Sequence, residues 1–368
     1  MSVANIRFLP SMWGSSVGLI FCLSIGILIS LVSNNIFLVW FGLELNMFGI
    51  IPFINSSPNQ TNNILFLTPQ EVNVSFFYFF VQVIGSLLFA WGGILSDWYI
   101  VSIIGLTIKV GVAPFFWWVP PLLTRLDWLS IGVVSTIQKI PAILLIRLVF
   151  DLNLEICLLF SVLGFLVATV GINFSSNNLK QLIAWSSISN MSILVVLIIL
   201  NNSLGLLYYV FYSVLVLIFC ICLNFTNSDN LCNSFINGEN ENINTISSLL
   251  LLVFSGLPPL VSFLLKIFFL SGFFLNDCSF LIMDIDMNGN SISFFYLLGS
   301  YLNSWNIVTL YISLIILQSI GYIKAFISIN SSKYSRLNII SNSVNNTNKI
   351  ILISLGILYF ISLILIWL

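Results

Sequence analysis

The chain has 368 residues, of which 59% are hydrophobic and 6% are charged, with a net charge of −1. A soluble domain carries about 25% charged residues, so the composition excludes a water-soluble protein and predicts an all-α polytopic membrane protein. The near-neutral charge argues against a nucleic-acid partner. The chain has no histidine, and its six cysteines form no C-x-x-C pair, which excludes histidine-ligated metals and predicts no metal or cofactor site.

Apolar stretches long enough to cross a bilayer recur along the chain. A spanning helix needs about 20 apolar residues. Eleven ranges approach or exceed this length: 15–34, 36–54, 74–95, 98–120, 129–149, 154–174, 179–200, 204–224, 246–275, 304–327 and 350–368. Three polar stretches, 55–73, 225–245 and 276–303, are expected to be solvated loops. No small-residue cleavage site follows the first basic residue, so we expect no removable signal peptide.

Basic residues outside the ranges are distributed unevenly. If the eleven ranges alternate in direction, Arg147 falls on one side, and the other side receives seven basic residues: Arg7, Arg125, Lys180, Lys324, Lys333, Arg336 and Lys349. Lysine and arginine gather on the cytoplasmic or matrix side. The N-terminus is therefore expected on that side and the C-terminus on the opposite side.

The second range holds a carboxylate, Glu44, inside the stretch WFGLELNMFG. A charge at the centre of a spanning helix costs about 2.5–3.5 kcal/mol. Such charges face the bundle interior or water and mark ion or proton paths. The alternative is a buried structural pair with one lysine.

The fourth and fifth ranges each combine a lysine with proline. Lys109 lies in IKVGVAPFFWWVPP with Pro114 close behind it, and Lys139 lies in QKIPA. Proline inside a helix removes a hydrogen bond, and in lipid the freed carbonyl needs a partner in protein or water. We therefore expect a broken helix and a hydrated site at Lys109; a kink that serves packing is the alternative.

The seventh and ninth ranges repeat these features. KQLIAWSSISNMS offers path-lining candidates, although serines in spans often bond only their own backbone. The candidates are Ser186, Ser187, Ser189 and Asn190. SGLPPLVSFLLK places Lys266 after a second expected helix break at Pro258 and Pro259.

The broken ranges are each fourth in a block of five, 15–149 and 154–327, and 350–368 adds a terminal helix. Five is odd, so the second block enters from the opposite face, as in inverted repeats of transporters. Three buried lysines face one acid, and burial favours the neutral form of an unpaired amine. Changing the distance between Glu44 and its lysine would therefore load or release a proton.

Six stretches carry a resemblance: WFGLELNMFGIIP, FFVQVIGSLLF, LTIKVGVAPFFWWVP, TIQKIPA, NLKQLIAWSSISNMS and GLPPLVSFLLK. In order over residues 15 to 270, they resemble the subunit 2 family of mitochondrial NADH:ubiquinone oxidoreductase, respiratory complex I. Its animal-type members are similar to sodium/proton antiporter subunits, with two inverted five-helix repeats. The resemblance implies a single antiporter-like membrane domain over 1–368.

The resemblance also implies roles and surroundings. Glu44, Lys109, Lys139 and Lys266 fall on the family's proton-translocating residues. NADH, FMN, iron–sulfur clusters and ubiquinone would act in other subunits. Implied partners are the antiporter-like subunit 4, the small subunit 4L and lipids such as cardiolipin. The implied location is the mitochondrial inner membrane, with the N-terminus in the matrix and the C-terminus in the intermembrane space.

The chain departs from this family where relatives often carry histidine or glutamate: it has Phe116, Pro121 and Asn190. Either water or serines replace any imidazole relay there, or that branch of the path is not essential. Two other functions remain open from the residues. One is a stand-alone cation/proton antiporter, which is expected to carry a carboxylate pair. The other is a structural spacer of the membrane arm, which leaves the cost of the buried lysines unexplained.

Overall fold

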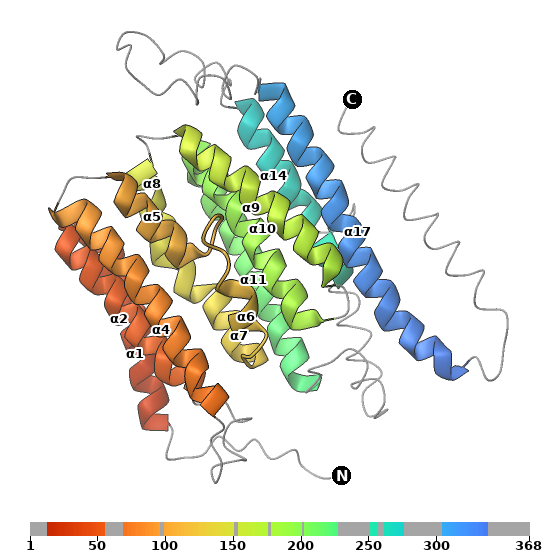
Figure 1. Ribbon diagram of the computed structural model, residues 1–368, viewed down its shortest axis with the longest axis horizontal. Coiled ribbons are helices and arrows are strands. Elements are labelled where there is room, and N and C mark those ends of the chain that lie inside the picture. The colour runs from red at the N-terminus through yellow and green to blue at the C-terminus, as the bar shows by residue number, and fades with distance from the viewer. Residues whose placement is uncertain are drawn as a thin grey trace. The chain divides into compact units, whose positions relative to one another are not determined.

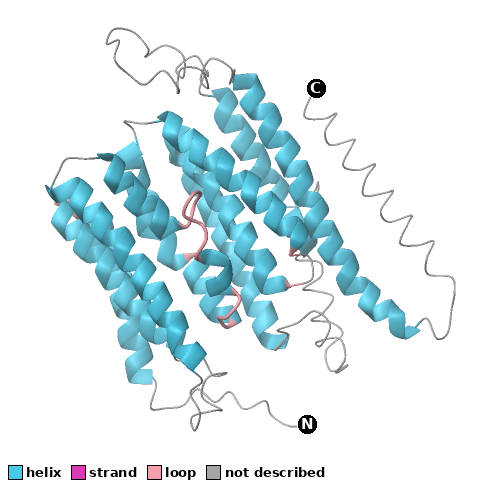
Figure 2. Ribbon diagram, in the orientation of Figure 1, coloured by secondary structure: helices cyan, strands magenta, loops and turns pink. Residues whose placement is uncertain are grey.

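The computed structural model describes residues 13–55, 69–95, 99–150, 154–175, 178–200, 202–226, 251–255, 261–275 and 304–337. All regular secondary structure in these ranges is helical (Figure 2), which confirms the predicted all-α class. The chain divides into two compact units, Met1–Asn153 and Leu154–Leu368.

The first unit is a bundle whose later helices are broken. Its elements, in chain order, are α1 (Trp13–Val32), α2 (Ile36–Asn55), α4 (Pro69–Ala90), the π-helix η2 (Trp91–Leu95), α5 (Tyr99–Val110), α6 (Val119–Leu123), α7 (Trp128–Ser135), the 3₁₀-helix η3 (Ile137–Lys139) and α8 (Ile140–Phe150). Helix α2 packs against α1 and α4, and α5 packs against α4 and α8 (Figure 1).

Two glycine pairs set the closest helix crossings of this unit. A Cβ at Gly42 on α2 would lie 2.7 Å from the Ser30 backbone nitrogen on α1, and one at Gly26 would lie 2.6 Å from the Asn46 nitrogen. On the other side, a Cβ at Gly105 of α5 would lie 2.5 Å from the backbone oxygen of Gly85 on α4. Small residues let helix backbones approach in this way in membrane proteins.

The second unit contains α9 (Leu154–Phe174), α10 (Leu179–Leu200), α11 (Asn202–Thr226), α14 (Val261–Leu275) and α17 (Ser304–Leu337). Helix α10 is its core: it contacts α9, α11 and α14, and most of its side chains are buried. Helix α9 also packs against α17, where the Tyr311 ring lies 5.6 Å from that of Phe165.

Within the described residues, five helical segments are long and apolar enough to cross a membrane: Val74–Gly93, Trp128–Ile146, Leu179–Leu200, Ser203–Asn224 and Val308–Ser328. Shorter apolar helices cover parts of four other predicted ranges, namely Phe21–Val32, Ile36–Pro52, Ile100–Val110 and Leu159–Phe174. The predicted terminal helix 350–368 and the loop 276–303 lie outside the described residues, so the eleven-span topology stays a prediction. The predicted loop 225–245 also lies outside them, except that its first two residues belong to α11, which ends at Thr226.

Two boundaries differ from those expected. The predicted loop 55–73 is helical from Pro69, where α4 begins, because proline fits the first turn of a helix, which has no need of its N–H. Helix α17 continues to Leu337, ten residues beyond the predicted end at 327. Its added segment, SINSSKYSRL, is polar, so the helix outlasts the apolar stretch that defined the prediction.

The close α1–α2 crossing predicts that a side chain at Gly42 lowers the stability of the protein. We expect Gly42→Val to destabilise the protein by about 1–3 kcal/mol, because its branched side chain would overlap the α1 backbone. The measurement is the thermal unfolding midpoint in detergent. Gly93→Ala is the control, since its Cβ would first meet a flexible side chain, Ile36, at 3.2 Å. Equal midpoints for the two variants would contradict the close crossing.

Candidate functional site

The predicted break in the fourth range occurs directly after Lys109. Helix α5 ends at Val110, and residues 111–118 form the loop that leads to α6 (Figure 2). Gly111 has a φ of +77°, which glycine adopts without the Cβ clash of other residues. Pro114 lies exposed within this loop. Lys109 is therefore in the last turn of a helix, where the backbone dipole favours a cation.

Three of the carbonyls freed by this break have hydrogen-bond partners. The backbone nitrogens of Gly111 and Val112 donate to the Thr107 oxygen at 2.9 and 3.2 Å. The Ile108 oxygen accepts from the indole nitrogen of Trp118 at 3.0 Å. The Lys109 oxygen accepts a longer bond, 3.5 Å, from Gln82 Nε2 on α4. The break is thus a built feature, as the cost of unpaired backbone groups in lipid requires.

Glu44 and Lys109 approach each other across α4. The Ser86 hydroxyl on α4 donates to the Glu44 carboxylate on α2. A Cβ on the neighbouring Gly85 would lie 2.9 Å from Cγ of Lys109, so the lysine stem lies against that glycine. The Glu44 carboxylate attracts the Lys109 ammonium, and Lys109 is only 6% exposed. The acid and the first lysine thus form one site.

One face of α4 therefore serves this site, and sequence reasoning missed it. Tyr78, Gln82 and Ser86 recur every four residues, which places them on the same face of a helix, and all three are buried. We call these three residues the α4 stripe. The available signal was two polar side chains four apart in the otherwise apolar run FFVQVIGSLLF.

Lys139 lies at a second break, which was not predicted. The fifth range is not one continuous helix: α7 ends at Ser135, Thr136 leaves helical geometry with φ −118° and ψ −83°, and a 3₁₀ turn leads to Lys139. The Thr136 hydroxyl donates to the Gly132 oxygen at 2.6 Å, a local bond that competes with the helix ladder. Pro141, lacking an N–H, cannot restore the pattern.

Several polar atoms around this second break are buried without a hydrogen-bond partner in the described part of the chain. They are Asn46 Oδ1, Tyr78 Oη, Gln138 Oε1 and Lys139 Nζ. Asn46 Nδ2 donates to the Gln138 backbone oxygen at 3.4 Å, and the Tyr78 hydroxyl lies near the Gln138 side chain without a well-aligned bond. Buried polar groups in proteins are nearly always satisfied, often by ordered water, so this cluster suits a hydrated site.

In the second unit, Lys266 is buried on α14, 9% exposed. Its Nζ donates to the backbone oxygen of Ser255 at 2.8 Å. Ser262 donates to the Val253 oxygen. Ser255 is the last described residue of helix 251–255, and α14 resumes at Val261. Pro258 and Pro259, the predicted break, fall in the interval outside the described residues.

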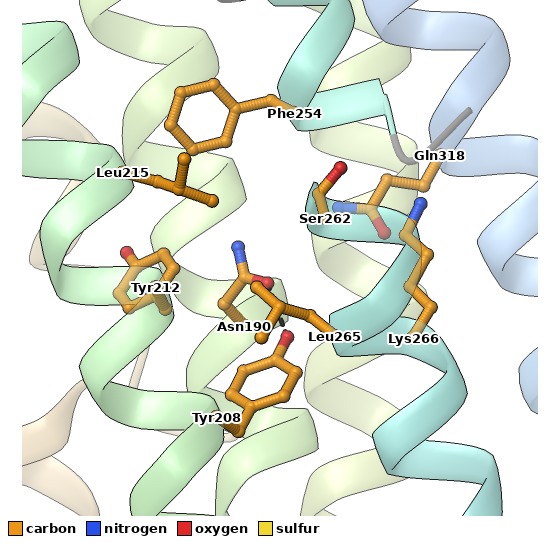
Figure 3. Close-up of a pocket in the computed structure, with 9 residues that line it drawn as sticks. All are labelled: Asn190, Tyr208, Tyr212, Leu215, Phe254, Ser262, Leu265, Lys266 and Gln318. Atoms are coloured by element: carbon orange, nitrogen blue, oxygen red, sulfur yellow. Dashed lines mark hydrogen bonds between the residues drawn. The ribbon is translucent and has the colours of Figure 1, made fainter. Parts of the chain in front are cut away.

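A small cavity adjoins Lys266 (Figure 3). It is lined by Asn190, Tyr208, Tyr212, Leu215, Phe254, Ser262, Leu265, Lys266 and Gln318. Tyr208 Oη donates to Asn190 Oδ1 at 2.7 Å, so a tyrosine on α11 reaches the amide on α10. These tyrosines were also missed; the stretch YYVFY, with Tyr208 and Tyr212 four apart, carried the signal.

The four path-lining candidates on α10 fall into two groups. The Ser186, Ser187 and Ser189 hydroxyls donate to backbone oxygens three residues earlier at 2.7–2.8 Å, which is the local bonding named as the alternative. Ser189 Oγ also accepts from Gln318 Nε2 at 3.0 Å. Asn190 alone among the four lines the cavity. The role of all four stays a prediction.

The hydrogen bond from Trp118 to the broken end of α5 predicts that two adjacent tryptophans differ in their effect on stability. Trp118→Phe should destabilise the protein by about 1–3 kcal/mol, because it leaves the buried Ile108 carbonyl unpaired. Trp117→Phe is the matched control, since Trp117 is 54% exposed. The measurement is the thermal unfolding midpoint of each variant in nanodiscs. Indistinguishable midpoints would show that the indole bond does not hold the break.

Comparison with known proteins places this architecture in a family. Residues 95–287, more than half of the chain, match the family described as NADH:quinone oxidoreductase/Mrp antiporter, transmembrane. The chain is 29% identical over 262 residues to NADH-ubiquinone oxidoreductase chain 2 of Dasypus novemcinctus, covering 67% of this chain and 73% of that protein. It is 26% identical over 324 residues to the same chain of Varanus baritji, covering 83% and 90%.

Two solved structures share the fold. A chain of the Mrp complex from Dietzia sp. superposes with a TM-score of 0.61 at 13% identity, covering 84% of this chain and 59% of that one. A chain of respiratory complex I from Thermus thermophilus gives a TM-score of 0.59 at 15% identity, covering 87% and 78%. The lysine-bearing helix breaks lie in a fold found in both assemblies, and the chain belongs to the NADH:quinone oxidoreductase/Mrp antiporter family of membrane proteins.

Proposed function

We propose that this chain is the proton-translocating subunit 2 in the membrane arm of respiratory complex I, NADH:ubiquinone oxidoreductase. The names of its sequence relatives support the subunit. The observation that carries proton movement is the first-unit site. There the buried Lys109 lies in the last turn of a broken helix with its stem against Gly85, and the neighbouring Ser86 bonds the Glu44 carboxylate. Charges at such depth mark ion and proton paths.

Glu44 and Lys109 form the loading step of this proposal. When the two approach, the carboxylate stabilises the ammonium and the amine takes up a proton. When they separate, burial favours the neutral amine and the proton leaves. Ser86 fixes the carboxylate by its hydrogen bond, and the end of α5 adds the negative pole of the helix dipole. The step requires only a change in distance.

Lys139 and Lys266 would continue the path. Lys139 Nζ has no hydrogen-bond partner in the described ranges, so it depends on water to hold a proton. Lys266 Nζ has only a neutral carbonyl partner in its described surroundings.

The proposal assigns electron transfer to other subunits. Without histidine and without a cysteine pair in C-x-x-C spacing, this chain would work without a redox centre, while NADH, FMN, iron–sulfur clusters and ubiquinone act elsewhere in the complex. Its partners would be the antiporter-like subunit 4, subunit 4L and lipids such as cardiolipin. It would lie in the mitochondrial inner membrane, with the N-terminus in the matrix and the C-terminus in the intermembrane space.

The wider topology belongs to the same proposal. The eleven spans would comprise two inverted five-helix repeats, 15–149 and 154–327, and a terminal helix. A stand-alone antiporter remains the second candidate because the Mrp complex structure shares the fold. The two differ in assembly: a complex I subunit copurifies with NADH:ubiquinone reductase activity, and an antiporter does not. A structural spacer differs from both, since it would tolerate neutral replacements of its buried lysines.

Replacing the lysines tests proton translocation directly. In assembled complex in sealed vesicles, Lys109→Met and Lys139→Met should slow proton transfer through this chain on the order of 100-fold, so that fewer protons move per electron. Lys324→Met is the control, because Lys324 is exposed. A normal ratio of protons to electrons in both buried variants would support the spacer instead.

Because Ser86 donates a hydrogen bond to Glu44, we also expect a substitution of Ser86 to change pumping. Ser86→Ala should lower coupled turnover by about two- to tenfold, the effect of one hydrogen bond to a charged group, and should displace the pH profile of pumping. Ser86→Thr keeps the hydroxyl and should restore both. Ser24→Ala, which removes an exposed bond to the Phe21 oxygen, is the control. An unchanged profile in Ser86→Ala would show that Glu44 needs no positioning.

A further inference from the structure

We propose that Asn46 is a positioning residue for Lys139. Its side-chain amide takes the place of the backbone N–H that Pro141 lacks, and so holds the turn that carries this lysine. The inference rests on the proposed proton-translocating function and extends it to a second polar residue of α2, the helix that bears Glu44. Asn46 is 1% exposed.

The turn before Lys139 leaves one backbone oxygen without its 3₁₀ partner. In a 3₁₀-helix each oxygen accepts from the N–H three residues later. The Lys139 nitrogen donates in this way to the Thr136 oxygen at 3.0 Å, and the nitrogen of the next residue donates to the Ile137 oxygen. The third bond of the series would join residue 141 to the Gln138 oxygen, but Pro141 has no N–H to donate.

The Asn46 amide fills this position from another helix. Its Nδ2 donates to the Gln138 backbone oxygen at 3.4 Å. The bond is long, and its weight comes from the setting, because a backbone oxygen without a partner is costly inside a membrane. A carbonyl oxygen accepts and cannot donate, so the amide has to present its nitrogen here and turn its own oxygen away. The bond therefore fixes the orientation of the Asn46 side chain.

The backbone of Asn46 is itself held closely. A Cβ at Gly26 on α1 would lie 2.6 Å from the Asn46 backbone nitrogen, so the α1 backbone lies directly against this turn of α2. Small residues allow such close helix contact in membranes. The amide therefore extends from a packed pair of helices to the broken segment, as a positioning residue requires.

Helix α2 presents its acid and its amide to different neighbours. Successive residues of an α-helix are about 100° apart, which separates Glu44 from Asn46 by about 200° around the helix. Glu44 accepts from Ser86 on α4, and Asn46 donates to the η3 turn. A movement of α2 that changes the distance from Glu44 to Lys109 would therefore also pull on the turn of Lys139. Asn46 thus links the proposed loading step to the next proposed proton carrier.

The test removes the amide donor and then returns a donor at the proline. Asn46→Leu keeps the approximate size of the side chain and removes its N–H groups, whereas Pro141→Ala restores a backbone N–H three residues after Gln138. In intact complex in sealed vesicles, Asn46→Leu should lower the coupled turnover about five- to tenfold and displace its pH profile. In the Pro141→Ala background, the same substitution should lower the turnover by about twofold or less.

Asn173→Leu is the matched control. The Asn173 amide also donates to a backbone oxygen of another helix, that of Leu317 on α17, at 3.1 Å. Asn173 lies on α9, which bears none of the four proposed proton-carrying residues. We expect this variant to keep the wild-type pH profile of pumping.

An equal loss from Asn46→Leu in both backgrounds, or a loss with an unmoved pH profile, would overturn the positioning role and leave Asn46 as a packing residue. If Asn46→Leu prevents assembly of the complex, recovery of assembly by Pro141→Ala supports the inference. Failure of the double variant to assemble as well would overturn it.

Lys139→Met separates this inference from the function on which it rests. If Lys139→Met lowers the ratio of protons to electrons while Asn46→Leu behaves like Asn173→Leu, the positioning role is wrong and the proton function stands. If Lys139→Met pumps normally, proton translocation through this lysine is wrong, and the inference falls with it. Losses in Lys139→Met and Asn46→Leu, with recovery by Pro141→Ala, support the inference.

Discussion

Inside a hydrocarbon layer, every backbone donor and acceptor needs a partner in protein or in water, and this constraint organises the described structure. Regular helix meets it automatically. The chain departs from regular helix after Lys109 and before Lys139, and Lys266 bonds the carbonyl at the end of segment 251–255. Lys109 and Lys139 therefore lie at departures from regular helix, and the Lys266 amine bonds a backbone carbonyl of another helical segment. Such places admit polar groups and water.

The three lysines differ in what compensates their charge. Lys109 has the Glu44 carboxylate and a helix C-terminus, and Lys266 has a carbonyl. The Lys139 amine has no partner in the parts of the chain described. A purely structural network would balance its charges, because an uncompensated buried ion is costly. The uneven compensation therefore does not fit a set of fixed, balanced ion pairs.

Sequence reasoning located the lysines, the acid and the first break, because a charge or a proline in an apolar run is conspicuous. It missed the break at Thr136, where the only local features are a hydroxyl that bonds the Gly132 oxygen and a proline five residues on, and neither marks a break by itself. It also missed the α4 stripe and the tyrosines around Lys266. These are ordinary residues for an apolar helix, and only the packing of α2, α4 and α5, or of α10, α11, α14 and α17, shows which face they occupy.

The glycine crossings indicate which parts would move if proton loading follows the Glu44–Lys109 distance. Gly85 and Gly105 hold α4 and α5 in backbone contact, and Gly26 and Gly42 do the same for α1 and α2. Each pair therefore acts as one packed body. The Ser86–Glu44 bond joins the two bodies, so separating the acid from the lysine requires either that this bond breaks or that Ser86 carries the carboxylate with it. In the second case the lysine stem on Gly85 would move too and the distance would barely change. In the proposed loading step the carboxylate would therefore have to leave the Ser86 hydroxyl whenever it moves away from Lys109, so the Ser86 bond would restrain that step.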